Sequence, residues 1–98
     1  MKSSTRGVYL ELMARVWLMS KGYDTFRSQN DHAPIDIVAV DLETGETIFC
    51  AAKAVYYPYV ENVRKSGYPQ SSAQKRLGVE IIGVTHEGSC FWATRGDV

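Results

Sequence analysis

Two residues of opposite charge lie in strongly apolar surroundings in the first half of this chain of 98 residues. Asp36 precedes the apolar run 37–40, and Lys53 lies within the equally apolar segment 50–55. A charge in such surroundings is costly unless it is paired or holds a cation. Two explanations therefore remain open from these residues alone. Asp36 and Lys53 are either an ion pair or solvated strand ends, or they belong to a site that binds a metal ion.

Glu11 adds a second carboxylate to this pattern. It lies between Leu10 and Leu12 in a stretch with helical spacing of its apolar residues. Taken alone, Glu11 is most simply a solvated residue on the outer face of a helix. Taken with Asp36 and Lys53, it places two acidic groups and one basic group on the predicted helix and on two of the predicted strands, and both explanations stay open from the residues alone.

The elements that must position these residues follow from periodicity. Helical spacing predicts a helix over 5–21, with Gly22 as its stop. Alternating and β-branched residues predict strands. The segment 56–77 carries Pro58, Gly67 and Pro69, and we expect it to form a long excursion with at most one or two helical turns, around 72–76. The predicted fold is one α+β (α/β-like) domain over 1–98, with the N-terminal helix packed on a mixed sheet of about five strands. These strands are expected at 23–28, 35–40, 47–55, 79–85 and 89–94.

Composition excludes some functions. Eleven basic residues balance eleven acidic ones, so a nucleic-acid surface would have to arise from local segregation of charge. No run of eighteen apolar residues is present, and we expect no membrane partner. Cys50 and Cys90 lack metal-ligand spacing, which favours reduced thiols in a cytoplasmic, intracellular protein over a disulfide.

The order Gly7-x3-Glu11, Gly22-Tyr23, Pro34-x-Asp36 and Ala51-x-Lys53 resembles the PD-(D/E)XK nuclease superfamily, whose core runs helix, three strands, helix, strand. The longer runs 9–12, 19–23, 31–36 and 41–45 are similar to small endonucleases of this superfamily associated with group I introns (homing endonucleases) and, more distantly, to archaeal Holliday-junction resolvases. The resemblance covers 7–55 well and 78–94 loosely. It implies a restriction-endonuclease-like core in a bacterial or phage-like context, and a metal-dependent DNA endonuclease that hydrolyses phosphodiester bonds.

The resemblance also implies roles for single residues. Asp36 and Glu11 would ligate Mg²⁺ (or Mn²⁺), a cation that prefers hard oxygen ligands, and the backbone carbonyl of Ala52 could contribute a further oxygen. Lys53 would hold the attacking water and the scissile phosphate and offset charge that develops in the transition state.

Ala51 departs from the family pattern, which carries Glu, Asp or Gln at this position. A methyl group neither ligates metal nor orients water. Three explanations are open: a substitution introduced to inactivate the enzyme, a natural descendant that only binds, or replacement by another side chain such as Glu61 or Gln70. The intact remainder of the pattern favours the first.

The excursion 56–77 is basic and rich in tyrosine. Basic side chains contact phosphates, and tyrosines stack on bases. A solvated loop or an oligomer interface would have the same composition. The resemblance favours contact with double-stranded DNA, and a cut through both strands implies a homodimer or higher homo-oligomer. The alternatives are a catalytically inactive nuclease fold that binds DNA or protein, and a small scaffold domain. The DNA-contacting residues expected here are Arg64, Lys65, Tyr68, Lys75 and Arg76.

Overall fold

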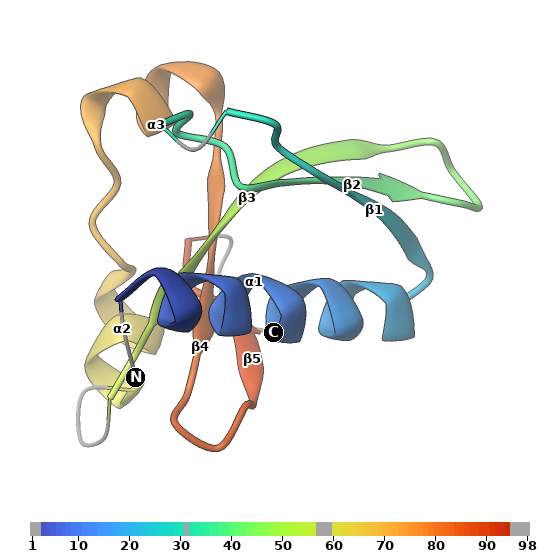
Figure 1. The fold of residues 1–98 in the computed structure, drawn as a ribbon. Coiled ribbons are helices and arrows are strands. Elements are labelled where there is room, and N and C mark those ends of the chain that lie inside the picture. The colour runs from blue at the N-terminus through green and yellow to red at the C-terminus, as the bar shows by residue number, and fades with distance from the viewer. Residues whose placement is uncertain (1–2, 31, 57–59, 95–98) are drawn as a thin grey trace.

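The computed structural model describes residues 3–30, 32–56 and 60–94, and within these ranges all side chains except those of 3–6 and 64–66. One long helix packs on a five-stranded mixed sheet, so the α+β class predicted from the sequence is confirmed (Figure 1). The elements are α1 (Ser3–Ser20), β1 (Tyr23–Arg27), β2 (Ile37–Asp41), β3 (Thr47–Ala54), α2 (Val60–Ser66), α3 (Ser72–Leu77), β4 (Glu80–Val84) and β5 (Cys90–Trp92).

The strands lie in the sheet in their order along the chain, β1-β2-β3-β4-β5. β1, β2 and β3 form an antiparallel meander, whereas β4 runs parallel to β3 and pairs antiparallel with β5. A parallel neighbour cannot be reached by a tight turn, and here α2 and α3 make the crossover between β3 and β4.

α1 covers one face of the sheet. Ala14 and Leu18 are fully buried at helical spacing, and they pack on a core of alternate strand residues that includes Ile37, Ile48 and Cys50. The rings of Trp17 and Trp92 meet edge to face with centroids 5.1 Å apart. Among the described residues, no helix is long and apolar enough to cross a membrane.

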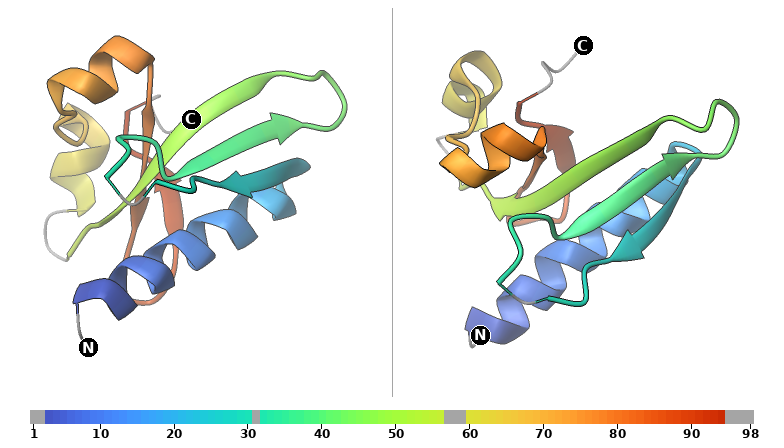
Figure 2. Two further views of the ribbon diagram at one scale, coloured as in Figure 1. Left: turned by 45° about the horizontal axis from the view of Figure 1, so that its top comes forward. Right: turned by 90° about the horizontal axis from the view of Figure 1, so that it is seen from above.

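On the opposite face α2 packs on a second buried cluster, called the second core below, which comprises Ala51, Val55, Val60, Val79, Ile81, Phe91 and Ala93. α3 lies beside the start of β4 (Figure 2) and donates from its buried Gln74 to the Pro34 carbonyl. α3 begins in a capping box between Ser71 and Gln74 and ends at Gly78, whose φ of 69° suits glycine. The prediction for this excursion was right for α3 and wrong for α2, which it left out. The apolar side of α2 consists only of Val60 and Val63, too short a pattern to predict a helix, and their packing on the second core favours it.

The β2–β3 turn lies at the far end of the hairpin (Figure 1). The backbone N–H groups of Thr44 and Glu43 donate to the carboxylate of Asp41 and hold its pKa below the usual value. Gly45 follows with a φ of 79°. The observed strands are one or two residues shorter at most ends than the periodicity predicts, and β2 alone continues one residue further, to Asp41. The two-residue differences lie at the end of β5 and at the start of β2, where the Asp36 carboxylate accepts the N–H of Ala52.

Candidate active site

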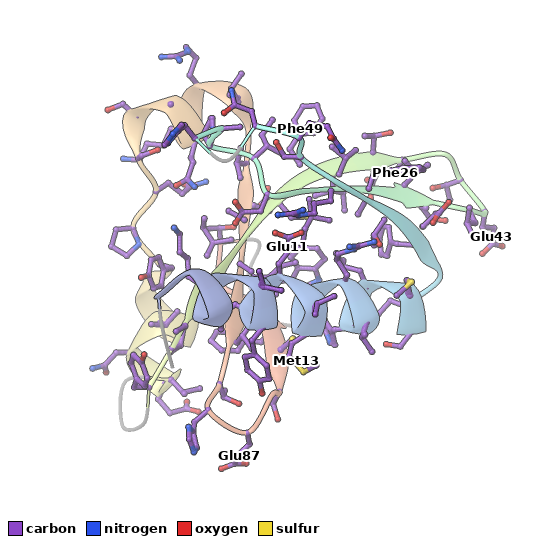
Figure 3. The ribbon with its side chains drawn as sticks, viewed as in Figure 1. Glu11, Met13, Phe26, Glu43, Phe49 and Glu87 are labelled. Atoms are coloured by element: carbon purple, nitrogen blue, oxygen red, sulfur yellow. The ribbon has the colours of Figure 1, made fainter. Side chains whose placement is uncertain are left out.

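A small pocket lies between α1 and the segment that joins β1 to β2. Glu11 points toward the strands from α1 (Figure 3) and reaches this pocket from one side. Asp36 reaches it from the residue just before β2. The structure therefore brings together the two carboxylates that the sequence singled out. The lining consists of Glu11, Arg27, Ser28, Asn30, Ile35 and Asp36.

Asp36 occupies the point where the β2–β3 ladder ends. Its N–H donates to the Cys50 carbonyl at 2.9 Å, and its Oδ2 accepts the N–H of Ala52 at 3.0 Å. The carboxylate thus takes the place that a backbone carbonyl would fill in a longer strand. Within the described part of the chain its Oδ1 has no hydrogen-bond partner. One oxygen of Asp36 is structural, and the other is available to a ligand.

The carboxylate of Glu11 forms an ion pair with the guanidinium group of Arg27. Its Oε1 lies 2.9 Å from Nε of Arg27, and the side chain of Glu11 is 18% exposed whereas that of Arg27 is 53% exposed. The guanidinium comes from the last residue of β1. Sequence reasoning did not select Arg27, although the alternation of Tyr23, Thr25 and Arg27 along β1 placed these three side chains on one face.

Lys53 lies on β3 opposite Gly83 and is half-buried. It is not part of the lining of the Glu11–Asp36 pocket. Between these two described residues, Asp36 and Lys53, no ion pair forms, so that explanation of the pair does not hold. The other structural explanation, two solvated residues at strand ends, stays open, because Asp36 directly precedes β2 and Lys53 is next to last in β3. By alternation along β3, Lys53 shares its face with Ala51 and not with the α1 core.

Ala51 is only 1% exposed and packs within the second core among Val55, Ile81 and Phe91. Its neighbour Ala52 uses its N–H for Asp36. A larger side chain at position 51 would have to displace apolar neighbours or extend past them toward the end of the ladder.

The two side chains suggested as replacements for the missing group are placed differently. The Nε2 of Gln70 donates to the Val79 carbonyl at 2.6 Å, which anchors the amide against β4. Glu61 is exposed on α2. Across residues 3–30, 32–56 and 60–94, no group of three or more His, Cys, Asp and Glu side chains is arranged to hold a metal ion.

The residues predicted to contact DNA fall in α2, α3 and the link between them. Lys75 and Arg76 are exposed in the last turn of α3. Tyr68 is half-buried and packs against the second core. Arg64 and Lys65 belong to α2, and their side chains lie outside the described ones.

The two cysteines form no disulfide with each other, which agrees with the sequence-based expectation of reduced thiols. Cys50 is buried, and burial raises the pKa of the Cys90 thiol to about 11. A raised pKa keeps this thiol protonated and unreactive at neutral pH.

Comparison with known proteins adds nothing to this geometry: no family model, no curated protein and no solved structure matches the chain.

Proposed function

We propose that this chain is a metal-dependent DNA endonuclease of the PD-(D/E)XK type, impaired by the alanine at position 51. The observation that carries the proposal is the meeting of Glu11 and Asp36 in one pocket at the end of the β2–β3 ladder. The order of elements, α1, three strands, a helical crossover and a further strand, agrees with the core that the resemblance predicts.

The donor set suits a hard divalent cation. Asp36 offers an oxygen without a protein partner in the described structure, and Glu11 offers a carboxylate from α1. Mg²⁺ keeps several waters and needs only one or two carboxylates from protein. When bound, such a cation polarises a phosphate and lowers the pKa of a coordinated water. Glu11 and Asp36 would hold it, with the Ala52 carbonyl as a further candidate.

Lys53 is the residue proposed to stabilise charge in the transition state. It follows directly after Ala52, whose N–H fixes the Asp36 carboxylate, and its side chain has no ion-pair partner among the described residues. Because Lys53 lies on the face of β3 opposite α1, a phosphate held at the pocket would have to extend across the end of the β2–β3 ladder to contact this ammonium group.

The second candidate is a catalytically inactive nuclease fold that binds DNA or protein. The packing of Ala51 favours it, because a carboxylate placed within the second core would be desolvated. The proposed partner is double-stranded DNA for the first candidate and DNA or a protein for the second. In both, the chain acts as a homodimer or higher homo-oligomer, and the compartment is a reducing cytoplasm.

A plasmid-nicking assay with Mg²⁺ tests the first candidate against the second. We expect the chain as it stands to bind duplex DNA and to cut it weakly or not at all. Ala51→Gln or Ala51→Glu should raise the cleavage rate by two to three orders of magnitude, roughly 3–4 kcal/mol of transition-state stabilisation. Lys53→Ala in that background should abolish the gain.

Thr47→Gln is the matched control, because it adds the same amide to an exposed position of the same strand. It should leave cleavage unchanged. If the variants at position 51 remain folded, bind duplex DNA and do not cut it, the endonuclease proposal is wrong and the binding module stands.

A further inference from the structure

A second pocket lies at the carboxyl ends of β3 and β4, the parallel pair of the sheet. This pair ends at Ala54 and Val84, after which β3 leads into the crossover and β4 into the turn to β5. Ligands of open sheets bind outside the carboxyl ends of parallel strands, where such connections diverge. The first half of α1 crosses this end of the sheet (Figure 1). The lining consists of Tyr9, Leu10, Ala54, Tyr56, Val84, Thr85 and His86.

The walls of this pocket are held by contacts of the fold. Val84 is 1% exposed and belongs to the core beneath α1, and Ala54 lies opposite it in the strand register. The β4–β5 turn approaches α1 at Gly88, where a Cβ would lie 3.4 Å from the Tyr9 hydroxyl and 3.3 Å from Sδ of Met13. The Tyr9 side chain is therefore positioned by the turn before any ligand binds.

The lining carries no Asp, Glu, Lys or Arg side chain. A charged ligand would lose its hydration there without gaining an ion pair. The pocket differs in this respect from the one at Glu11 and Asp36, with which it shares no residue. The composition of the lining therefore selects a neutral ligand.

The size of the pocket narrows the class of ligand. Its volume is 220 Å³. An apolar cavity of about 150 Å³ holds one benzene ring, and sites for drug-sized molecules begin at about 300 Å³. A volume between these two values suits two fused rings.

The side chains at the pocket add aromatic surface and unpaired polar groups. Tyr56 is 48% exposed and offers its ring for stacking. The Thr85 hydroxyl already accepts the N–H of Ser89 at 3.1 Å. The Tyr9 hydroxyl and the His86 ring have no hydrogen-bond partner among the described residues. Both groups can donate and accept, so a ring system with several polar atoms along its edge pairs with them better than a hydrocarbon does.

We propose that this pocket binds a purine base, with its rings against Tyr56 and its polar edge at the Tyr9 hydroxyl and at His86. A purine is neutral, consists of two fused rings and carries several hydrogen-bonding atoms on its edge, so it meets all three conditions of the lining. The proposal does not depend on the proposed nuclease activity, because adenosine contains no phosphodiester bond.

Titration of the ¹⁵N-labelled chain with adenosine, followed by amide chemical shifts, tests the proposal. We expect saturable shifts at residues 9–10, 54 and 84–86 with a dissociation constant of about 1 mM or less. Uridine has the same sugar and a single ring, and it should bind at least roughly tenfold more weakly. The absence of saturation up to about 5 mM adenosine, or shifts centred on other residues, would overturn the proposal. Indole or uridine binding as tightly as adenosine would contradict the selection of a purine.

Variants identify the contacts, and the shift mapping on the unmodified chain does not depend on their folding. Tyr56→Leu should raise the dissociation constant for adenosine about fivefold or more, because it removes the stacking ring. Tyr9→Phe keeps its ring and should raise it roughly two- to tenfold. Phe26→Leu is the matched control, because Phe26 is 52% exposed on β1, and it should have no effect. Equal effects of Tyr56→Leu and Phe26→Leu would contradict binding at this pocket.

A free nucleoside and an unstacked base of single-stranded DNA present the same ring to the pocket. The trinucleotides d(TAT) and d(TTT) separate these two sources. If d(TAT) binds more tightly than adenosine and loses this gain in Tyr56→Leu, the purine belongs to a nucleic acid. If d(TAT) binds no more tightly than adenosine, the ligand is the free nucleoside. Equal binding of d(TAT) and d(TTT) at residues 9–10, 54 and 84–86 would contradict recognition of a purine.

Discussion

At the scale of single residues, Asp36 combines a structural bond with a free oxygen. Oδ2 accepts the Ala52 N–H at 3.0 Å, and this donor would otherwise be left at the end of the β2–β3 ladder. An unpaired, partly buried N–H costs free energy whatever the function of the site. The bond also fixes the direction of the carboxylate, which prepares Oδ1 for a ligand. The structural and the metal-binding interpretations of Asp36 are thus compatible and can be separated by substitution.

Asp36→Asn should separate them. An asparagine oxygen still accepts the Ala52 N–H, so the free energy of unfolding should change by less than about 1 kcal/mol, whereas Asp36→Ala should lower it by roughly 1–3 kcal/mol. Both variants should lose Mn²⁺ binding in calorimetric titration, because both remove the charge. Asp24→Asn, at an exposed position of β1, should keep Mn²⁺ binding. If the Mn²⁺ affinity of Asp36→Asn is unchanged, the Asp36 carboxylate does not bind the cation and only accepts the Ala52 N–H at the end of the β2–β3 ladder.

In the proposed metal site, Arg27 would compete with the cation for Glu11. The pair is 2.9 Å apart, and Arg27 is more than half exposed, so its contribution to stability is small. Arg27→Gln should raise the affinity for Mn²⁺ by up to about fivefold, the equivalent of at most 1 kcal/mol for an exposed pair. Arg76→Gln removes the same charge from α3 and should have no effect. A lower Mn²⁺ affinity in Arg27→Gln would contradict competition.

The candidate site could be predicted from the sequence in part. Glu11 and Asp36 stood out because a charge among apolar neighbours needs a reason, and the fold brings both to one pocket. Arg27 could not be selected, because its partner lies sixteen residues earlier on another element and only the docking of α1 reveals the contact. The tight packing around Ala51 was equally hidden, since it depends on α2 and β5.

At the scale of elements, the local sequence pattern was sufficient to predict those helices and strands whose apolar spacing is visible within the element itself. Alternation along β2 and β3 and helical spacing in α1 predicted these elements within a few residues. α2 could not be predicted this way, because its stability comes from contacts made after the chain folds. A similar non-local contact appears at Gly83, which lies beneath the ring of Phe91 on the neighbouring strand.

Gly83→Ala should destabilise the sheet at this contact. A Cβ at position 83 would lie 2.6 Å from Cζ of Phe91, whose ring is buried. We expect the free energy of unfolding in urea to fall by roughly 1–3 kcal/mol. Gly7→Ala is the matched control, because its Cβ meets nothing within 4 Å and it lies inside α1. There the same change should stabilise by roughly 0.5–1 kcal/mol. Equal effects at the two sites would contradict this account.

At the scale of the whole molecule, equal numbers of acidic and basic residues do not mean that the two kinds are evenly distributed over the surface. Eleven basic and eleven acidic residues give a net charge of zero. The fold separates them in part: exposed Glu43 and Glu46 lie in the β2–β3 turn, and the crossover between β3 and β4 carries exposed Lys75 and Arg76 at its end but also exposed Glu61. The DNA binding proposed for this chain of zero net charge would therefore come from one region, and its affinity should depend strongly on the salt concentration.

The salt dependence of DNA affinity tests this segregation. Each neutralised phosphate contributes about 0.9 to the magnitude of the slope of log K against log salt. If Arg64, Lys65, Lys75 and Arg76 of the crossover each contact one phosphate, the predicted slope is near −3.6 per chain. Lys75→Gln/Arg76→Gln should reduce its magnitude by about 2, as measured by fluorescence anisotropy with a labelled duplex. Lys21→Gln removes a charge at the end of α1, where the ammonium group lies over the Trp17 ring, and should leave the slope unchanged. Two outcomes would place the DNA-binding surface away from α3 and contradict the proposed role of the crossover. In the first, the slope does not change in Lys75→Gln/Arg76→Gln. In the second, Lys21→Gln reduces the slope by the same amount.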